Sequence, residues 1–359
     1  MFNIEMVQLL IHFIKIIKKE RKNMIIKEAF LQEEFLKIEK FLETFSLKLD
    51  NNLTKTFYIE NDNSDVIGTI SCQDYIIKDL AVDPNYQSEN LASILVKEIL
   101  NYFRLNNIHN YQVFTKPIYK QVFVSLGFKE IVQTDKVIML EGGVTSINDK
   151  IKEIKNIITY RFGEINETSD IACIVMNANP ITNGHVYLIE EASKNHKMVV
   201  LFIVEEDKSE FTFKERFSMA YLSTMRLGNV CVIPSSKYVV SQSTFPSYFL
   251  KNETEVSEQY SLIDALIFKE YFIKNLFIKK RYIGTETINK MINYNNILKQ
   301  VLDDKIVILE RLKENEEVIS ASTVRKLMRE GKVEEALQYT PQETAFILRG
   351  LASEKYGIN

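Results

Sequence analysis

Residues 177–185 read Asn-Ala-Asn-Pro-Ile-Thr-Asn-Gly-His and directly follow the apolar run Ile-Ala-Cys-Ile-Val-Met at 171–176. The run predicts a buried strand, and the Thr-x-Gly-His group predicts a helix that begins after a proline turn. Amide groups at a helix N-terminus attract anions, and a glycine lets a phosphate approach the backbone closely because it has no Cβ. Thr182 and His185 can donate hydrogen bonds to phosphate oxygens. The stretch predicts a nucleotide-phosphate site that consists of Asn177, Asn179, Pro180, Thr182, Gly184 and His185.

A second polar helix start lies far downstream at residues 319–325, which read Ile-Ser-Ala-Ser-Thr-Val-Arg. Serines are good N-cap residues, so an ordinary helix cap is the alternative interpretation. Beside the first motif, the permanent cation of Arg325 predicts binding of the β- and γ-phosphates. Two such helix starts in this order predict ATP that is cleaved at its α-phosphate. The residues assigned to ATP here are Ser320, Ser322, Thr323 and Arg325.

Three further positions follow predicted strands or begin the next helix. Lys208 follows a strand at 198–204 and is a candidate for binding phosphate or carboxylate, with a solvated charged loop as the alternative. Arg216 lies in the helix predicted at 213–226, where it lines the pocket or forms a surface salt bridge. Gly284 and Glu286 close the strand predicted at 280–284 and are expected to contact adenine or ribose, unless this is an ordinary strand end.

The non-periodic stretch 240–250 mixes aromatic and hydroxyl side chains. Loops of this kind often shape small substrate pockets, although structural packing of the aromatic rings is an equal alternative. The residues predicted to line a substrate pocket here are Thr244, Phe245, Ser247 and Tyr248.

The composition limits the classes of protein that the chain can belong to. With 359 residues, the chain is too long for one ordinary core, so two domains are expected. A net charge of −3 provides no basic field for nucleic acid or an anionic membrane. Three widely spaced cysteines argue against a disulfide framework or a cysteine metal site and favour a reducing cytoplasm. The apolar run at residues 6–17 is too short to span a bilayer, and residues 1–23 read as an amphipathic lead-in helix, an extension before Met24 or a weak membrane-surface helix.

The pattern of elements predicts an α/β protein with two domains. Residues 24–145 mix strands with amphipathic helices, and Gly142-Gly143 begins a flexible hinge. Residues 146–359 open with a connecting helix and then alternate strands and helices. This alternation predicts a doubly wound, Rossmann-like parallel sheet that binds its ligand beyond the carboxyl ends of the strands.

The first domain resembles the GNAT acetyltransferases. Residues 81–92 are similar to the loop that holds the acyl-CoA pyrophosphate in that family, and residues 119–128 are similar to its C-terminal helix and turn. Gln87 and Ala92 match the loop pattern, but Asn90 stands where a glycine is expected. Because a side chain there obstructs the approach of a diphosphate, we expect a scaffold or docking module rather than an active acetyltransferase.

The whole order of motifs resembles the citrate lyase ligase family, in which an acetyltransferase-like domain precedes a nucleotidyltransferase domain. The segments that carry the resemblance are 176–180, 184–185, 206–209, 244–250, 284–286 and 319–322. The resemblance implies an AMP-forming ligase that activates acetate with MgATP and acetylates a thiol. That thiol belongs to the phosphoribosyl-dephospho-CoA group on the acyl carrier subunit of citrate lyase. In this scheme Thr182 and His185 stabilise the α-phosphate, Lys208 and Arg325 neutralise phosphate charge, and Mg²⁺ binds through the phosphates rather than to a protein metal site.

Two other functions use parts of the same pattern. An adenylyltransferase of the pantetheine-phosphate or nicotinamide mononucleotide type has both helix-start motifs but makes a dinucleotide. A CoA-dependent N-acetyltransferase would use the first domain for catalysis and the second only to bind a nucleotide. A class I aminoacyl-tRNA synthetase is disfavoured, because the sequence has no Lys-Met-Ser-Lys-Ser loop.

Overall fold

The computed structural model describes residues 25–205, 209–239, 245, 248–286, 289–314 and 317–357. The lead-in helix predicted for residues 1–23 lies outside this part of the chain. Contacts divide the described chain into two compact units. The first unit comprises 25–128, Leu140–Val144 and 248–250, and the second comprises the rest. The domain boundary predicted at residue 145 stays a prediction.

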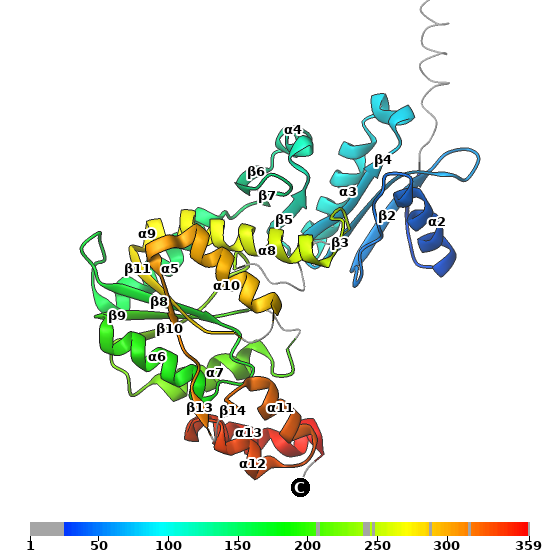
Figure 1. Ribbon diagram of the computed structural model, residues 1–359. Coiled ribbons are helices and arrows are strands. Elements are labelled where there is room, and N and C mark those ends of the chain that lie inside the picture. Colours follow the sequence, from blue (N-terminus) through cyan, green and yellow to red (C-terminus); the bar gives the residue numbers. More distant parts are fainter. Residues whose placement is uncertain are drawn as a thin grey trace, which may run out of the picture. The chain divides into compact units, whose positions relative to one another are not determined.

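A seven-stranded sheet forms the framework of the first unit, in the order β1-β2-β3-β4-β5-β7-β6 (Figure 1). Its outer strand β6 groups with the second unit. The strand bounds are Ile26–Glu28 (β1), Lys55–Glu60 (β2), Val66–Gln73 (β3), Ile76–Val82 (β4), Asn110–Thr115 (β5), Lys129–Gln133 (β6) and Ile138–Gly143 (β7). Helix α3 (Leu91–Leu105) contacts β2, β3 and β4, and helices α2 (Gln32–Glu43) and α4 (Lys120–Ser125) complete the unit.

Helix α3 begins where the sequence is similar to a pyrophosphate loop. A short 3-10 helix at Pro84–Glu89 precedes it, and Asn90 between them has φ 56° and ψ 27°. Glycine adopts this left-handed conformation more easily than any other residue, and asparagine tolerates it better than most. Asn90 therefore follows the backbone path expected of the family's glycine while keeping a side chain at that point.

The glycine pair predicted to begin a hinge ends strand β7 instead, and this corrects the sequence interpretation. A Cβ at Gly142 would lie 2.3 Å from the ring of Tyr111, and one at Gly143 would lie 2.1 Å from the carbonyl oxygen of His109. Gly143 also has φ +113°. Close packing against residues 109–111, rather than flexibility, accounts for both glycines.

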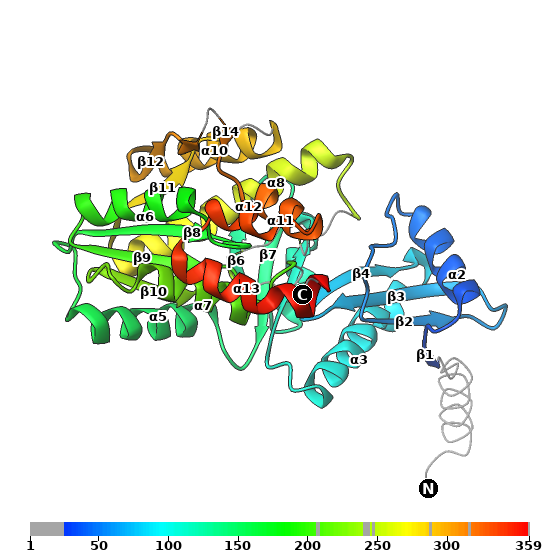
Figure 2. The same ribbon diagram turned by 90° about the horizontal axis from the view of Figure 1, so that it is seen from below.

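The second unit contains a five-stranded parallel sheet in the order β10-β9-β8-β11-β12, which Figure 2 shows side by side. The bounds are Ile171–Met176 (β8), Met198–Ile203 (β9), Val230–Pro234 (β10), Ile278–Gly284 (β11) and Ile306–Leu309 (β12). The chain winds outward from β8 to β10 and then crosses back to β11, so the predicted doubly wound sheet is confirmed. Its switch point lies between β8 and β11, where such sheets bind ligands.

Helices cover both faces of this sheet (Figure 1). α6 (Asn183–Asn195) and α7 (Phe213–Thr224) lie on one face, and α8 (Glu253–Ile267) and α10 (Asn289–Leu302) lie on the other. Because both faces are covered, the central strands β8 and β9 are continuous apolar runs that are almost entirely buried. α5 (Ile147–Phe162) precedes the sheet, with Ser146 and Asp149 forming a capping box.

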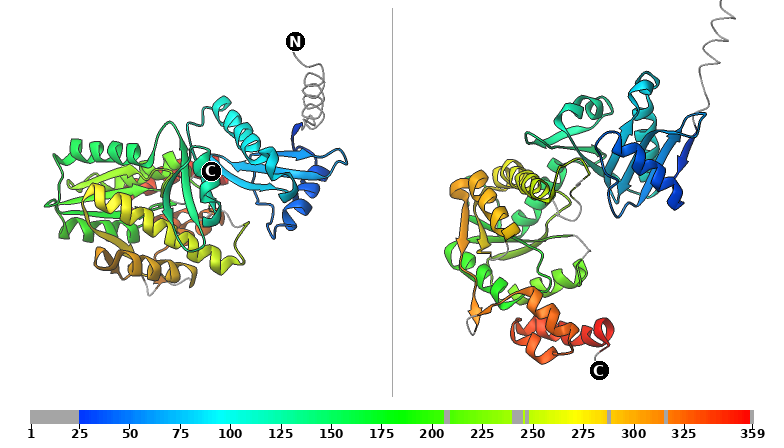
Figure 3. Two further views of the ribbon diagram at one scale, coloured as in Figure 1. Left: turned by 90° about the horizontal axis from the view of Figure 1, so that it is seen from above. Right: turned by 45° about the vertical axis from the view of Figure 1, so that its right-hand side comes forward.

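The C-terminal helices form a small group of their own, orange to red in Figure 3. α11 (Ala321–Arg329) contacts α12 (Val333–Gln338), and α13 (Gln342–Tyr356) packs on α7. The helix predicted at 257–275 is α8 followed by a π-helical turn, Phe268–Ile273, and a short α9 (Lys274–Leu276). A two-stranded ribbon, β13 (Lys313–Glu314) and β14 (Glu317–Val318), was not predicted. Within the described chain, no helix is long and apolar enough to cross a membrane.

Candidate functional site

A cavity of about 470 Å³ opens at the switch point of the parallel sheet. The ends of β8 and β11, the start of α6 and the start of α11 all contribute to its walls, and the chain after β12 closes one side. Residues from both predicted phosphate motifs line it, including Thr182, Gly184, His185 and Ser320. The two helix starts, far apart in sequence, therefore converge on one cavity.

Helix α6 begins with a reciprocal cap that fixes the orientation of the His185 ring. The backbone N–H of Thr182 donates to Nδ1 of His185 over 3.0 Å, and the Thr182 hydroxyl lies 2.9 Å from the same nitrogen. An N–H group can only donate, so Nδ1 is the acceptor and the ring proton is on Nε2. Because His185 lines the cavity, its Nε2–H is the donor available to a ligand there.

The ring of His185 is neutral at physiological pH. Burial, reinforced by the positive charge of Arg311, lowers its pKa from 6.5 to about 4. A neutral donor at a helix N-terminus can stabilise charge on a phosphate oxygen without changing its own protonation state. This suits an electrostatic role and does not suit a general acid near pH 7.

Gly184 lies against the second helix start. A Cβ at Gly184 would lie 3.5 Å from the carbonyl oxygen of Ile319, which is ordinary van der Waals contact. The protein itself therefore leaves room for a side chain at this position. That this glycine makes space for a ligand phosphate stays a prediction.

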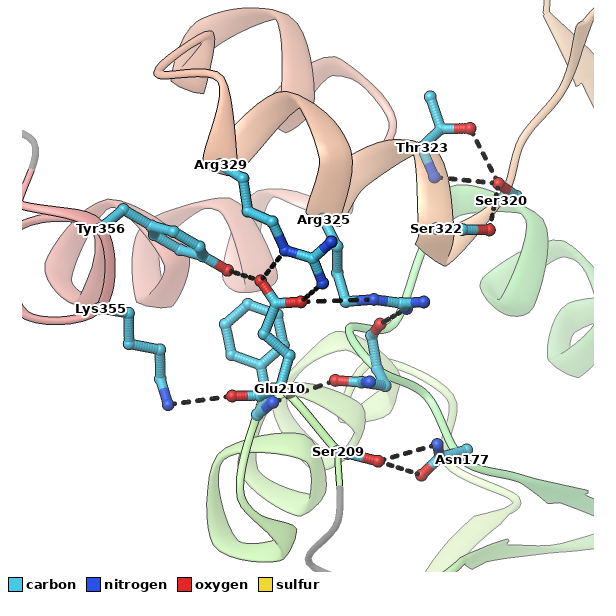
Figure 4. A network of polar contacts seen from close by, with 12 residues as sticks. Asn177, Ser209, Glu210, Ser320, Ser322, Thr323, Arg325, Arg329, Lys355 and Tyr356 are labelled. Carbon is cyan, nitrogen blue, oxygen red and sulfur yellow. Dashed lines mark hydrogen bonds and ion pairs between the residues drawn. The ribbon is translucent and has the colours of Figure 1, made fainter. Parts of the chain in front are cut away.

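The start of α11 is tied together by hydroxyl groups (Figure 4). Ser320 is the N-cap and accepts from the backbone N–H of Thr323 over 3.1 Å. Its hydroxyl also lies 3.1 Å from that of Ser322 and 2.8 Å from that of Thr323. Ser320 lines the cavity, whereas Ser322 is exposed and, like Thr323, is not part of the cavity wall. The ATP-binding roles of all three residues stay predictions.

Arg325 lies one turn into α11 and faces the loop that follows β8. Its guanidinium donates to the backbone carbonyl of Asn179, and its Nε lies 3.6 Å from the carboxylate of Glu210. Glu210 also accepts hydrogen bonds from Arg329 and Tyr356 (Figure 4). In this arrangement Glu210 is the counter-ion that holds the arginines beside the β8 loop.

A second, open hollow lies beside this network and includes residues of the loop that follows β8. Its lining residues are Asn177, Asn179, Ser209, Glu210, Arg325 and Arg329. Asn177 lines both the hollow and the main cavity, and its side chain donates to Ser209 over 3.0 Å. The Asn179 side chain accepts from the Phe211 backbone N–H, and Pro180 is buried in the turn. The two guanidinium groups outnumber the Glu210 carboxylate, so the hollow has a net positive charge that favours anions.

Gly284 and Glu286 both line the main cavity. Glu286 forms an ion pair with Arg311, whose side chain also lies near Gly284. Arg311 itself was not predicted from the sequence, since it follows β12 in a stretch with no recognisable motif. Only the fold brings this cation to the cavity.

Two predicted pocket residues have structural roles instead. Arg216 is fully buried, and its guanidinium donates to the carbonyls of Phe211, Asn177 and Val204, so it holds the loops behind the site. Tyr248 belongs to the first unit, where its hydroxyl donates to the carbonyl of Phe114 over 3.4 Å. These findings correct both predictions. In each case a polar side chain is used to satisfy buried backbone acceptors.

The remaining predicted residues of the substrate loop give a mixed result. Phe245 is buried and packs edge-on against Tyr260, which lines the cavity, so it supports the wall from behind. Lys208, Thr244 and Ser247 lie outside the described residues, and their roles stay predictions.

Taken together, the doubly wound sheet and the paired helix starts define an α/β protein with a nucleotidyltransferase-like fold. Comparison with protein-family models finds the citrate lyase ligase C-terminal domain at residues 171–348 and an acetyltransferase (GNAT) domain at residues 22–139.

Curated relatives match most of the chain. A [citrate [pro-3S]-lyase] ligase of Haemophilus influenzae is 32% identical over 324 residues, which cover 87% of this chain and 94% of the relative. The corresponding ligase of Escherichia coli is 29% identical and covers 94% of both chains. That of Klebsiella pneumoniae is 30% identical over 89% of this chain and 94% of its own. The protein belongs to the [citrate [pro-3S]-lyase] ligase family.

Proposed function

We propose that this protein is an ATP-dependent, AMP-forming ligase that activates acetate and acetylates the acyl carrier subunit of citrate lyase. Family membership supports the reaction class. The observation that carries the proposal is the convergence of two helix N-termini on one cavity at the switch point, with the Nε2–H of His185 available to a ligand there.

In the first step an acetate oxygen attacks the α-phosphorus of ATP. The bond from that phosphorus to the bridging oxygen of pyrophosphate breaks, and acetyl-adenylate forms. His185 stabilises charge on the α-phosphate through Nε2–H, and Thr182 orients the ring. Arg325 neutralises charge on the β- and γ-phosphates, beside Asn177 and Ser209. Mg²⁺ bound with ATP would supply further positive charge for the departing pyrophosphate, in addition to that of Arg325.

In the second step a thiolate attacks the carbonyl carbon of acetyl-adenylate, AMP leaves, and a thioester forms. The thiol proton passes to water. We propose that the thiol belongs to the phosphoribosyl-dephospho-CoA group of the acyl carrier subunit and that the reaction takes place in the cytoplasm. All three cysteines of this chain are buried, and burial raises the pKa of the Cys173 thiol to about 12. This supports direct transfer to the acceptor, without an acyl group on the enzyme.

The test combines the protein with ATP, acetate and deacetylated citrate lyase. The expected result is acetate-dependent release of AMP and pyrophosphate together with recovery of citrate lyase activity. Pyrophosphate exchange that needs no acetate would instead indicate an adenylyltransferase. Acetyl transfer from acetyl-CoA without ATP would indicate an acetyltransferase.

A further inference from the structure

The inner end of the main cavity contains a buried cation that neither helix-start motif involves. Arg281 extends from the middle of strand β11 and is 2% exposed, yet it lines the cavity. It lies under α8 and α10, with its guanidinium 4.3 Å from the ring centre of Phe268. A fully buried arginine is costly unless its five N–H groups find acceptors.

Arg281 is only partly satisfied by the protein. Its Nη2 donates to the hydroxyl of Tyr294 over 3.0 Å, and that hydroxyl donates to Asp264 over 2.7 Å. Asp264 lies 3.7 Å from Nη1, which is close enough for ion pairing and too far for a hydrogen bond. Among the described residues, Nε and Nη1 have no hydrogen-bond partner although both atoms are buried.

The chemistry of this end of the cavity favours a small monocarboxylate. A guanidinium forms stronger hydrogen bonds with a carboxylate than with a neutral acceptor. The wall beside Arg281 consists of the stacked rings of Tyr260 and Tyr294, whose centroids lie 6.0 Å apart. A methyl group fits such a wall. Asp264 balances the arginine when the site is empty and repels any ligand that carries a second negative charge.

We propose that Arg281 binds the carboxylate of acetate, with Tyr294 and Asp264 as positioning residues that fix its guanidinium. This inference rests on the proposed function and adds the acetate subsite to it. Arg325, the cation proposed for the polyphosphate tail, lines the separate hollow, so acetate and the tail have different cations. Arg281 and the start of α6 line the same cavity, so acetate on Arg281 would share that cavity with the α-phosphate proposed at His185.

The test uses the full chain and compares Arg281→Met with a matched control, Lys280→Met. Lys280 is the preceding residue of β11, points to the opposite face of the sheet and is not part of the cavity wall. In the assay of acetate-dependent pyrophosphate release, Arg281→Met should raise the KM for acetate at least thirtyfold and change the KM for ATP less than threefold. Lys280→Met should change neither.

Calorimetric titration of acetate into protein saturated with α,β-methylene-ATP measures the subsite without catalysis. Wild type should bind acetate, and Arg281→Met should not. If Arg281→Met does not fold, Arg281→Lys is measured in the same way, and it should weaken acetate at least tenfold because one compact ammonium replaces the guanidinium fork. Succinate should bind far more weakly than acetate to the wild-type protein.

The two proposals fail in different ways. If the wild type is active and Arg281→Met has the same KM for acetate, the acetate subsite is overturned and the proposed ligase function is not. A shift in the KM for the acyl carrier instead of acetate would show that Arg281 binds the acceptor, and would also overturn it. Wild type with no acetate-dependent pyrophosphate release would overturn the proposed function, and absence of acetate binding by calorimetry would overturn the subsite as well.

Discussion

At the scale of single residues, the two nitrogens of His185 have separate tasks. Nδ1 accepts from Thr182 to close the helix cap, and Nε2–H is the donor proposed for the α-phosphate. Asparagine places an oxygen near the position of Nδ1 but has no group at Nε2. His185→Asn should therefore keep the fold and lose about 100- to 1,000-fold in kcat, as expected for removal of one transition-state donor. His185→Ala should lower kcat by the same factor and should also remove the cap of α6. Near-normal pyrophosphate release by His185→Asn would contradict this role.

The lowered pKa of His185 also predicts how stability depends on pH. The unfolded chain binds a proton at this residue near pH 6.5, whereas the folded chain does so only near pH 4. The free energy of unfolding should therefore fall as the pH is lowered from about 6.5 to about 4, by at most about 3 kcal/mol, and level off below. Urea denaturation at several pH values, with His185→Asn as the reference, isolates this contribution. Parallel curves for the two proteins would show that His185 titrates normally.

At the scale of elements, helix α11 presents two arginines that differ in their surroundings. Arg325 is half-buried and donates to the carbonyl of Asn179, while Arg329 is one turn further along and largely exposed. Exposed charges are screened by water and salt, so Arg325→Met should lower kcat/KM for ATP about 10- to 100-fold and Arg329→Met less than threefold. Steady-state kinetics at varied ATP decides between them. Equal losses of kcat/KM in the two variants would indicate that both arginines bind the polyphosphate tail of ATP, and would contradict the separate role of Arg325.

The elements also show what sequence reasoning can reach. Strand β8 and the start of α6 were predicted because an apolar run and a cap motif are local signals. Tyr248 could not be assigned from its neighbours in sequence, because its contact with Phe114 depends on the tertiary fold. Arg281 and Arg311 were missed for the same reason. A lone arginine in or after a strand carries no motif, and only the crossing of the sheet brings both to the cavity.

At the scale of the whole molecule, the first unit has an acetyltransferase fold with a changed pyrophosphate loop. Asn90 adopts the left-handed backbone of a glycine but retains a side chain there. We therefore predict that the full-length protein shows no saturable binding of acetyl-CoA by calorimetry, while ATP binding is readily measured. The first unit then serves as a scaffold or docking module for the acyl carrier. Saturable acetyl-CoA binding that survives removal of ATP would contradict this prediction.

The central claim is that two helix starts from distant parts of the chain bind one triphosphate. A crystal structure with α,β-methylene-ATP and acetate tests it most directly. We predict an α-phosphate oxygen within hydrogen-bond distance of Nε2 of His185, and β- or γ-phosphate oxygens within reach of Arg325. A nucleotide bound elsewhere, or phosphates that contact only one of the two helix starts, would contradict the claim.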